Sequence, residues 1–287
     1  MNVGVVGNPR FKDIKTLLSQ LNEYGAANGL SVLVGPDLHQ VMPDPLPELT
    51  PTTDLALLLT FGGDGTLLRG ARLMKSSNAP ILGINLGRVG FLTSAGPDQM
   101  MAALDSFLSG EYRIENRCAL DSSIEGEDGS ARAGSMVLND IVVHKEGVAR
   151  VIRIRVWVDD EEVGVYSADG VIVSTPTGST AYALSAGGPI VMPEVDALTI
   201  TAICPHTLAV RPLVVPGSAV ITLQQAQPRR DEVLVSYDGQ VEATLQSHER
   251  VVVRQSPDAV KLVRLGSKGY FEGVRQKLQW GDLSDRG

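Results

Sequence analysis

The pattern of apolar residues changes near residue 112, and this change constrains the fold of the chain more than any other feature of its sequence. Before it, short apolar runs typical of strands alternate with apolar residues spaced three and four positions apart, which is the spacing of one helical face. After it, short strand-like runs follow one another, with turn residues between several of them. The first pattern predicts a parallel sheet with helices on its faces, and the second predicts a β-sandwich-like domain.

Individual elements can be predicted in the first region. Strand signals lie at 3–6, 31–34, 55–61 and 81–84, and helical signals lie at 14–21, 67–74 and 101–108. Five prolines between residues 36 and 51 predict a loop without regular structure. The run at 55–61 is continuously apolar, which is typical of a strand buried on both faces of a parallel sheet.

The second region is rich in strand signals, and only 180–186 has a helical pattern. The strand-like runs lie at 135–144, 151–158, 163–166, 170–174, 198–203, 219–223, 233–237, 241–245, 250–254 and 260–264. We therefore predict an α/β domain over 1–112, a β-rich domain over 113–265 and a tail over 266–287. The tail contains Phe271, Val274, Leu278 and Trp280, and these apolar residues predict that it packs back on the first domain.

Composition narrows the classes of function. The 287 residues carry a net charge of −8 and 5% aromatic side chains, which argues against a nucleic-acid partner, because that partner needs a basic face or stacking platforms. No apolar run approaches the roughly 20 residues that span a bilayer, and no signal peptide pattern is present. We therefore expect a cytoplasmic protein with no membrane partner. Two cysteines without C-x-x-C spacing and four scattered histidines predict no zinc or iron–sulfur site.

A glycine turn follows the predicted buried strand directly. The sequence Gly62-Gly63-Asp64-Gly65-Thr66 stands between strand and helix, and that arrangement presents backbone N–H groups and a helix dipole to an anion. It lacks the G-K-[ST] of a P-loop and the G-x-G-x-x-G of a dinucleotide turn. The turn predicts a phosphate site of another type.

The acid in this turn is its most informative residue. A carboxylate 4 Å from a phosphate is repelled by about 4 kcal/mol at an effective dielectric constant of 20. Asp64 is tolerable there if it takes a proton from an attacking hydroxyl or faces a metal bound to the phosphates, and both uses fit phosphoryl transfer. The alternative is that Asp64 only caps the following helix.

A hydroxyl-rich segment follows the predicted strand at 170–174. Ser and Thr side chains dominate residues 174–180, and hydroxyls that both donate and accept hydrogen bonds suit ribose, amide and base edges. The alternative is that these residues cap the short helix and close turns. Ser179 lacks the G-x-S-x-G pattern of a hydrolase nucleophile.

Four stretches of the chain, in this order, resemble the NAD kinase family: GGDGTLLR (62–69), LND (138–140), DGVIVSTPTGSTAYALSAGGP (169–189) and CPHTLAVRPLVV (204–215). The resemblance implies transfer of a phosphate from ATP to the 2′-hydroxyl of the adenosine ribose of NAD. It implies ATP and NAD(H) as partners, Mg²⁺ or another divalent cation with the ATP, and a homodimer or homotetramer.

The resemblance also implies roles for single residues. Asp64 would be the general base. The nucleotide-binding positions would be Asp64, Gly65, Arg69, Phe91, Asn139, Asp140, Arg150, Asp169, Thr180, Ala181, Tyr182, Ser185 and Gln240. Asp140 departs from the family pattern, in which this acid is a glutamate. For Gln240 the alternative reading is a hairpin, because Asp238-Gly239 before it is a turn signal.

Two other functions fit parts of the sequence. A lipid kinase would share the GGDGT loop and act on a lipid hydroxyl, although the hydroxyl-rich segment argues against it. A non-catalytic NADP sensor would use the same scaffold, although it would have no use for Asp64.

Overall fold

The computed structural model describes residues 1–279, except 43, 76, 88–89, 148–150, 228–231 and 267–268. The chain divides into two compact units. The first unit combines Met1–Asn116 with Val260–Gly287, and the second is Arg117–Ala259. The second predicted domain therefore ends too late at residue 265, because the strand at its end belongs to the sheet of the first unit.

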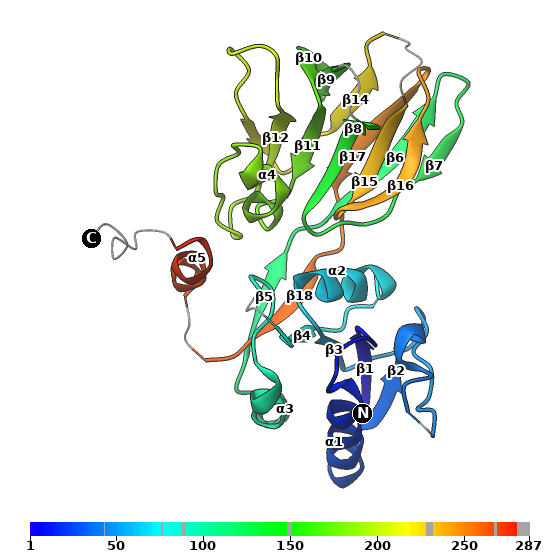
Figure 1. Ribbon diagram of the computed structural model, residues 1–287, viewed down its shortest axis with the longest axis vertical. Helices are drawn as coiled ribbons and strands as arrows, with labels where there is room; N and C mark the ends of the chain where they lie inside the picture. Colours follow the sequence, from blue (N-terminus) through cyan, green and yellow to red (C-terminus); the bar gives the residue numbers. More distant parts are fainter. Residues whose placement is uncertain are drawn as a thin grey trace. The chain divides into compact units, whose positions relative to one another are not determined.

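The first unit is built on one six-stranded sheet, in the order β2-β1-β3-β4-β18-β5 (Figure 1). The pairs β1–β2, β1–β3, β3–β4 and β4–β18 are parallel, as the alternating pattern predicted. The strands are β1 (Asn2–Gly7), β2 (Ser31–Val34), β3 (Leu57–Phe61), β4 (Ile81–Ile84), β5 (Arg113–Arg117) and β18 (Val260–Arg264).

Helices cover both faces of this sheet. One face packs against α1 (Ile14–Ala27) and α3 (Met100–Ser109), and the buried side chains of these helices share a core with Leu57, Leu59 and Phe61 of β3. The other face packs against α2 (Asp64–Leu73), where Gly70 brings the helix close to the side chains of Leu58 and Thr60. Alternation along β3 therefore divides its buried residues between the two layers.

The order of the strands places the glycine turn at a switch point. From β1 the chain runs outward to β2 and then returns to β3 on the other side of β1. In open α/β sheets, ligands bind at the carboxyl ends of the strands where the order reverses. The turn 62–66 leaves the carboxyl end of β3 at this place.

The second unit consists of two six-stranded antiparallel sheets, in the orders β10-β9-β14-β17-β6-β7 and β13-β12-β11-β8-β15-β16. Inward-facing residues of both sheets form one hydrophobic core, as a sandwich requires. The strands are β6 (Leu120–Gly126), β7 (Ala131–Ala133), β8 (Asp140–Lys145), β9 (Ile152–Val158), β10 (Glu161–Ala168), β11 (Gly170–Ser174), β12 (Ala197–Ile203), β13 (Leu213–Pro216), β14 (Ile221–Gln225), β15 (Val233–Tyr237), β16 (Gln240–Leu245) and β17 (Glu249–Gln255).

Some local predictions differ from the structure. The strand predicted at 135–144 begins only at Asp140, because Val137 forms an isolated bridge to Leu120 instead. The helix predicted at 180–186 is divided between η3 (Gly178–Thr180) and α4 (Tyr182–Ser185). The proline-rich loop includes one turn of 3-10 helix, η1 (Pro36–Leu38), since proline is well placed at the start of a helix. A further 3-10 turn, η2 (Pro97–Gln99), precedes α3.

The predicted tail contains α5 (Tyr270–Leu278). Val274 is fully buried, but Phe271 is 52% exposed and does not pack as expected. Trp280 lies outside the described residues.

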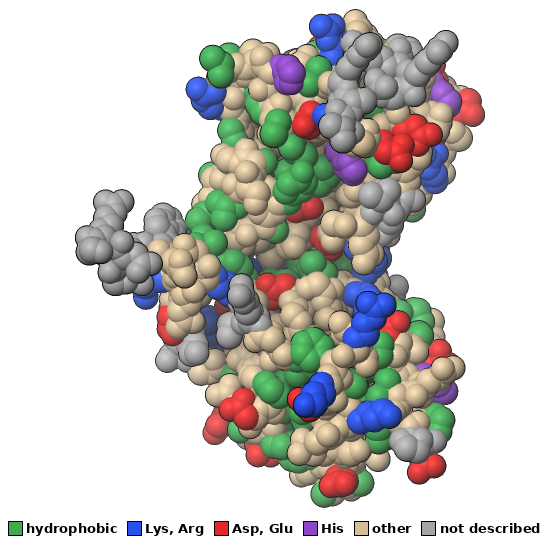
Figure 2. Space-filling view, in the orientation of Figure 1, with side chains coloured by type: hydrophobic (Ala, Val, Ile, Leu, Met, Phe, Trp, Pro, Cys, Tyr) green, Lys and Arg blue, Asp and Glu red, His purple; other side chains and the backbone are tan. Residues whose placement is uncertain are grey.

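Within the described residues, no helix has the length and apolarity needed to cross a bilayer. On the face of the first unit seen in Figure 2, Lys and Arg side chains are interspersed with Asp and Glu side chains.

Candidate active site

Asp64 is held by the backbone of a neighbouring loop. Its Oδ2 accepts a hydrogen bond from the N–H of Phe91 at 2.7 Å, and its Oδ1 accepts one from the N–H of Leu92 at 3.0 Å. The residue that caps α2 is Gly63, and no side chain caps that helix. A Cβ at Gly90 would lie 1.9 Å from Oδ1 of Asp64, so the loop approaches the carboxylate closely only because residue 90 is glycine. The geometry therefore contradicts the helix-capping alternative.

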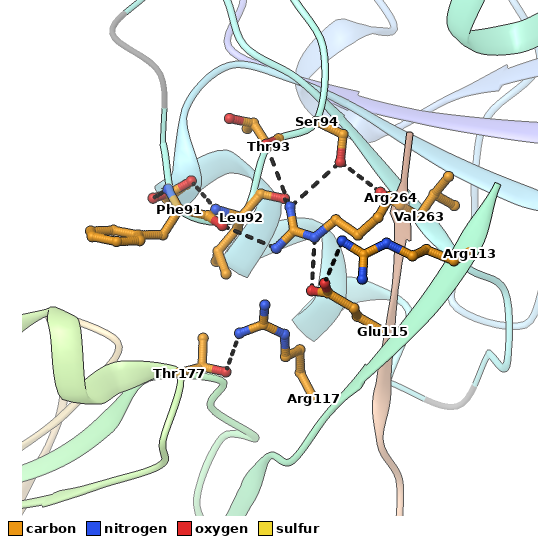
Figure 3. Close-up of polar contacts among 11 residues, drawn as sticks. Phe91, Leu92, Thr93, Ser94, Arg113, Glu115, Arg117, Thr177, Val263 and Arg264 are labelled. Atoms are coloured by element: carbon orange, nitrogen blue, oxygen red, sulfur yellow. Dashed lines mark hydrogen bonds and ion pairs between the residues drawn. The ribbon is translucent and has the colours of Figure 1, made fainter. Parts of the chain in front are cut away.

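The opposite side of this loop is bound by Arg264 at the end of β18 (Figure 3). Its guanidinium donates to the carbonyl oxygens of Phe91 at 3.0 Å and Leu92 at 2.9 Å, and its Nε donates to Glu115 at 2.8 Å. The loop that presents two N–H groups to Asp64 thus has its carbonyl oxygens fixed by a charged donor. Such charge-assisted hydrogen bonds are among the stronger ones in proteins.

The Lys277 side chain of α5 lies over the same loop. Its Nζ is 3.8 Å from the centroid of the Phe91 ring, a cation–π contact. Burial lowers the pKa of the Lys277 amine to about 8. The negative charge of Asp64 opposes this shift, and the positive charge of Arg264 adds to it.

Arg69 is bound to the end of β1 and to η1. It lies on α2, and its guanidinium donates to the carbonyl oxygen of Gly7 at 2.6 Å and pairs with Asp37 at 2.9 Å. These contacts use both terminal nitrogens of the guanidinium that the family resemblance assigned to phosphate, and its Nε has no hydrogen-bond partner among the described residues. Gly65, by contrast, is exposed at the start of α2.

In the second unit, Asp238 organises the predicted Asn139-Asp140 motif. Its carboxylate accepts hydrogen bonds from the backbone N–H groups of Leu138, Asn139 and Asp140 at 2.8 to 3.3 Å. Asp238 and Gly239 both have positive φ and join β15 to β16, which confirms the predicted hairpin turn before Gln240.

Asp140 itself is 3% exposed. Burial raises its pKa to about 7, and the nearby Asp238 carboxylate acts in the same direction, while a hydrogen bond from the backbone N–H of Tyr182 opposes the shift. The side chain of Asp140 therefore changes its charge near neutral pH.

The hydroxyl-rich segment is hydrogen-bonded to the backbone of the Asn139-Asp140 motif and of Leu138 before it. Thr175 donates from Oγ1 to the carbonyl oxygen of Leu138 at 2.6 Å, and its own N–H donates to the carbonyl oxygen of Asn139 at 2.9 Å. A Cβ at Gly178 would lie 2.1 Å from that same Asn139 oxygen. The fully buried Ser179 bonds the backbone of Pro176 and Val191, so its hydroxyl is structural.

The remaining predicted positions differ in exposure. Tyr182 is 48% exposed, Ser185 and Gln240 are exposed, and Thr180 and Ala181 are half-buried. Asp169 pairs with Nζ of Lys145 at 2.7 Å. Arg150 lies outside the described residues.

Comparisons with known proteins decide the family. The model of the ATP-NAD kinase N-terminal domain matches residues 3–112, and that of the ATP-NAD kinase C-terminal domain matches residues 138–265. The chain belongs to the NAD kinase family.

NAD kinases of two bacteria match this chain over nearly its whole length. An NAD kinase of Gemmatimonas aurantiaca is 44% identical over 286 residues, which is 100% of this chain and 98% of the relative. An NAD kinase of Geobacter sulfurreducens is 40% identical, with 96% of each chain covered.

Two solved structures of NAD kinases are also similar to this chain. Yeast NADH kinase complexed with NADH has a TM-score of 0.89 and 26% identity, with 98% of this chain and 88% of that chain covered. An NAD kinase from Archaeoglobus fulgidus in complex with ATP has a TM-score of 0.75 and 25% identity, with 97% of this chain and 99% of that chain covered. The predicted fold class is therefore confirmed.

Membership in the NAD kinase family makes the chain an enzyme, a transferase that phosphorylates NAD at the expense of ATP. The lipid-kinase and sensor alternatives are set aside on the same evidence.

The sequence motifs identified Asp64 but not Arg264, Glu115 or Lys277, which the fold brings to the same loop. In the second unit they also missed Arg117, which is 5% exposed and donates to Oγ1 of Thr177 at 3.2 Å (Figure 3).

Proposed function

We propose that this NAD kinase transfers the γ-phosphoryl group of ATP to the 2′-hydroxyl of the adenosine ribose of NAD, and that Asp64 is the general base. The observation that carries the proposal is the carboxylate of Asp64, which lies in the turn after β3 and is oriented by two backbone N–H groups. A base must be oriented before it can take a proton from a hydroxyl within hydrogen-bond reach.

The hydrogen bonds to Asp64 leave it able to act. A carboxylate has about four acceptor positions, and the N–H groups of Phe91 and Leu92 use two of them. The residue is half-buried rather than enclosed, so a ribose hydroxyl can donate to a remaining position. Proton transfer by such a group contributes roughly 10²- to 10⁴-fold to a rate.

The nucleotide phosphates need hydrogen-bond donors. Residues 63–65, at the start of α2, present backbone N–H groups and the favourable end of the helix dipole. Among the residues described, no three His, Cys, Asp or Glu side chains gather in a way that could hold a metal ion. We infer that Mg²⁺ or another divalent cation enters with ATP as part of the substrate and is bound mainly by the triphosphate.

The second unit supplies the proposed contacts to NAD. Tyr182, Ser185 and Gln240 offer exposed side chains to the dinucleotide, and Thr180 and Ala181 flank them. Asn139 and Asp140 are fixed by Asp238 and present a polar pair at the start of β8. Asp169 and Arg150 complete the set that we assign from the motifs.

A homodimer or homotetramer and a cytoplasmic location belong to the same proposal. Apolar side chains are exposed on edge strands of both sheets of the second unit, with Val165 on β10 at 42% and Val214 on β13 at 56%. Edge strands of this kind favour association. Both cysteines are free thiols, which suits a reducing compartment.

The test is direct synthesis of NADP. Purified protein is incubated with ATP, Mg²⁺ and NAD, and NADP is measured with an NADP-specific dehydrogenase. We expect NADP to form only when ATP and NAD are both present and to stop when EDTA removes the cation. Phosphorylation of a diacylglycerol or sphingoid base without NADP formation would overturn the proposal.

A further inference from the structure

Lys277 is a charged residue near Asp64 that the sequence motifs do not explain. It lies in the last turn of α5, beyond residue 265, where the match to the C-terminal family model ends. Its Nζ is buried over the Phe91 ring and has no hydrogen-bond acceptor among the described residues. Ammonium groups are strongly hydrated, so a buried one without an acceptor is costly unless a ligand supplies the acceptor.

Other cations of the first unit near this loop are already engaged. Arg264 donates to Glu115 and to the carbonyl oxygens of the loop. Arg69 is bound to Gly7 and Asp37. A phosphate brought near Asp64 is repelled by roughly 4 kcal/mol at 4 Å in an effective dielectric of 20, and a cation free to bind it would offset that repulsion.

We infer that Lys277 binds phosphate oxygens of a nucleotide at the Asp64 loop, as a substrate-binding residue supplied by the C-terminal helix. The inference rests on the proposed function, because it takes the ligand to be ATP or NAD. The Phe91 ring holds the ammonium in place through the cation–π contact before the phosphate arrives. The phosphate oxygens then provide the acceptors that the protein does not.

The pH dependence of this site follows from the same surroundings. The charged groups that face Lys277 are Asp64 on α2 and Arg264 on β18, with Glu115 of β5 behind Arg264. The other charged residues of α5 are Glu272 in its first turn and Arg275 in its last turn. With its pKa at about 8, the amine loses its charge in mildly alkaline solution. Binding of phosphate through Lys277 should weaken as pH rises through that value.

The test compares three variants by steady-state kinetics, with each nucleotide varied while the other is saturating. Lys277→Met removes the charge but keeps the apolar stem over Phe91. Lys277→Arg keeps a charge that does not titrate in this range. Arg275→Gln is the matched control, because it removes an exposed charge from the same turn of α5.

We expect Lys277→Met to lower kcat/KM by 10- to 100-fold, the usual effect of losing one hydrogen bond to a charged group. A fall in kcat/KM confined to ATP would show that Lys277 binds the triphosphate. A fall confined to NAD would show that it binds the pyrophosphate of NAD. An equal fall in kcat/KM for both nucleotides that arises from kcat would show that Lys277 binds the phosphoryl group being transferred. Lys277→Arg should stay within about fivefold of the wild type and flatten the decline above pH 8, and Arg275→Gln should stay within twofold.

Three results would overturn the inference. These are a Lys277→Met enzyme within threefold of the wild type for both nucleotides, an equal loss in Arg275→Gln, or an equal loss in Lys277→Arg. If Lys277→Met is misfolded by circular dichroism, Lys277→Gln replaces it in the same comparison. A wild-type protein that makes no NADP would refute the proposed function instead, so the two failures are distinguishable.

Discussion

The two units each place an aspartate in a different environment. Asp64 of the first unit is half-buried and receives two backbone N–H groups from one loop. Asp140 of the second unit is 3% exposed and lies near a second carboxylate, that of Asp238. Donors and access suit a carboxylate for chemistry on a ligand, whereas burial beside a like charge makes its charge depend on pH. The surroundings, and not the residue type, therefore determine what each of these two carboxylates can do.

The largest expected effect comes from replacing Asp64, the proposed general base. Asp64→Asn should lower kcat by 10²- to 10⁴-fold, because an amide cannot take the proton and only one of its two terminal atoms can accept an N–H. The dissociation constant for NAD, measured by calorimetry, should stay within threefold. Asp13→Asn, an exposed acid just before α1, is the control and should leave kcat unchanged. Near-full turnover in Asp64→Asn would remove the distinction between the two acids.

Replacing one glycine by alanine in each unit should lower stability in the second unit and turnover in the first. Gly178→Ala places a Cβ 2.1 Å from the carbonyl oxygen of Asn139, where backbone must move, so we expect the protein to lose about 3 kcal/mol or more of stability. Gly90→Ala meets the Asp64 side chain, so turnover should fall about 10- to 100-fold while the folded state persists. Thermal melting and kcat measured on both variants check this. A reversed pattern would contradict the assignment.

The next effect concerns the loop that holds Asp64. Arg264→Gln should lower kcat about tenfold or more with little change in either KM, because the carbonyl oxygens of Phe91 and Leu92 lose a charged donor and the loop shifts. Arg113→Gln is the matched control, since Arg113 also pairs with Glu115, at 3.4 Å. An equal loss of activity in both variants would show that only the charge near Glu115 matters.

The smallest effect is on stability and concerns Asp140. Its folded pKa of about 7 lies above the ordinary value of 3.8, so between these values the folded state binds more protons than the unfolded state. Stability should therefore fall as pH rises from about 4 to 7. Asp140→Asn should remove about 1–2 kcal/mol of this dependence, seen as a smaller difference in melting temperature between pH 5 and pH 8. Asp160→Asn, in an exposed turn, should leave the difference unchanged.

Sequence reasoning reached the fold class and singled out Asp64 because both depend on local signals. The run 55–61 and the turn after it are contiguous, so one stretch of sequence predicts strand, glycine turn and helix. Arg264 bonds a loop 173 residues before it, and Asp238 bonds Asn139 across 99 residues. No periodicity or turn signal connects residues so distant. The apolar run 260–264 predicts a strand for the same local reason, but its predicted place in the second domain is wrong. A strand's own sequence does not specify which strands it pairs with.

The position of β18 has a consequence for how the chain is made. It lies between β4 and β5 in the sheet of the first unit, yet it is synthesised after the whole of the second unit. On a ribosome, residues 117–259 are complete while the sheet that begins at residue 2 still lacks an inner strand. The sheet of the first unit can therefore be completed only after the second unit has been synthesised, which differs from the usual order, in which the N-terminal part folds first. A polypeptide terminated near residue 259 would contain Asp64 and all strands of the sandwich, but it would lack Arg264, whose guanidinium binds the carbonyl oxygens of the loop that orients that acid.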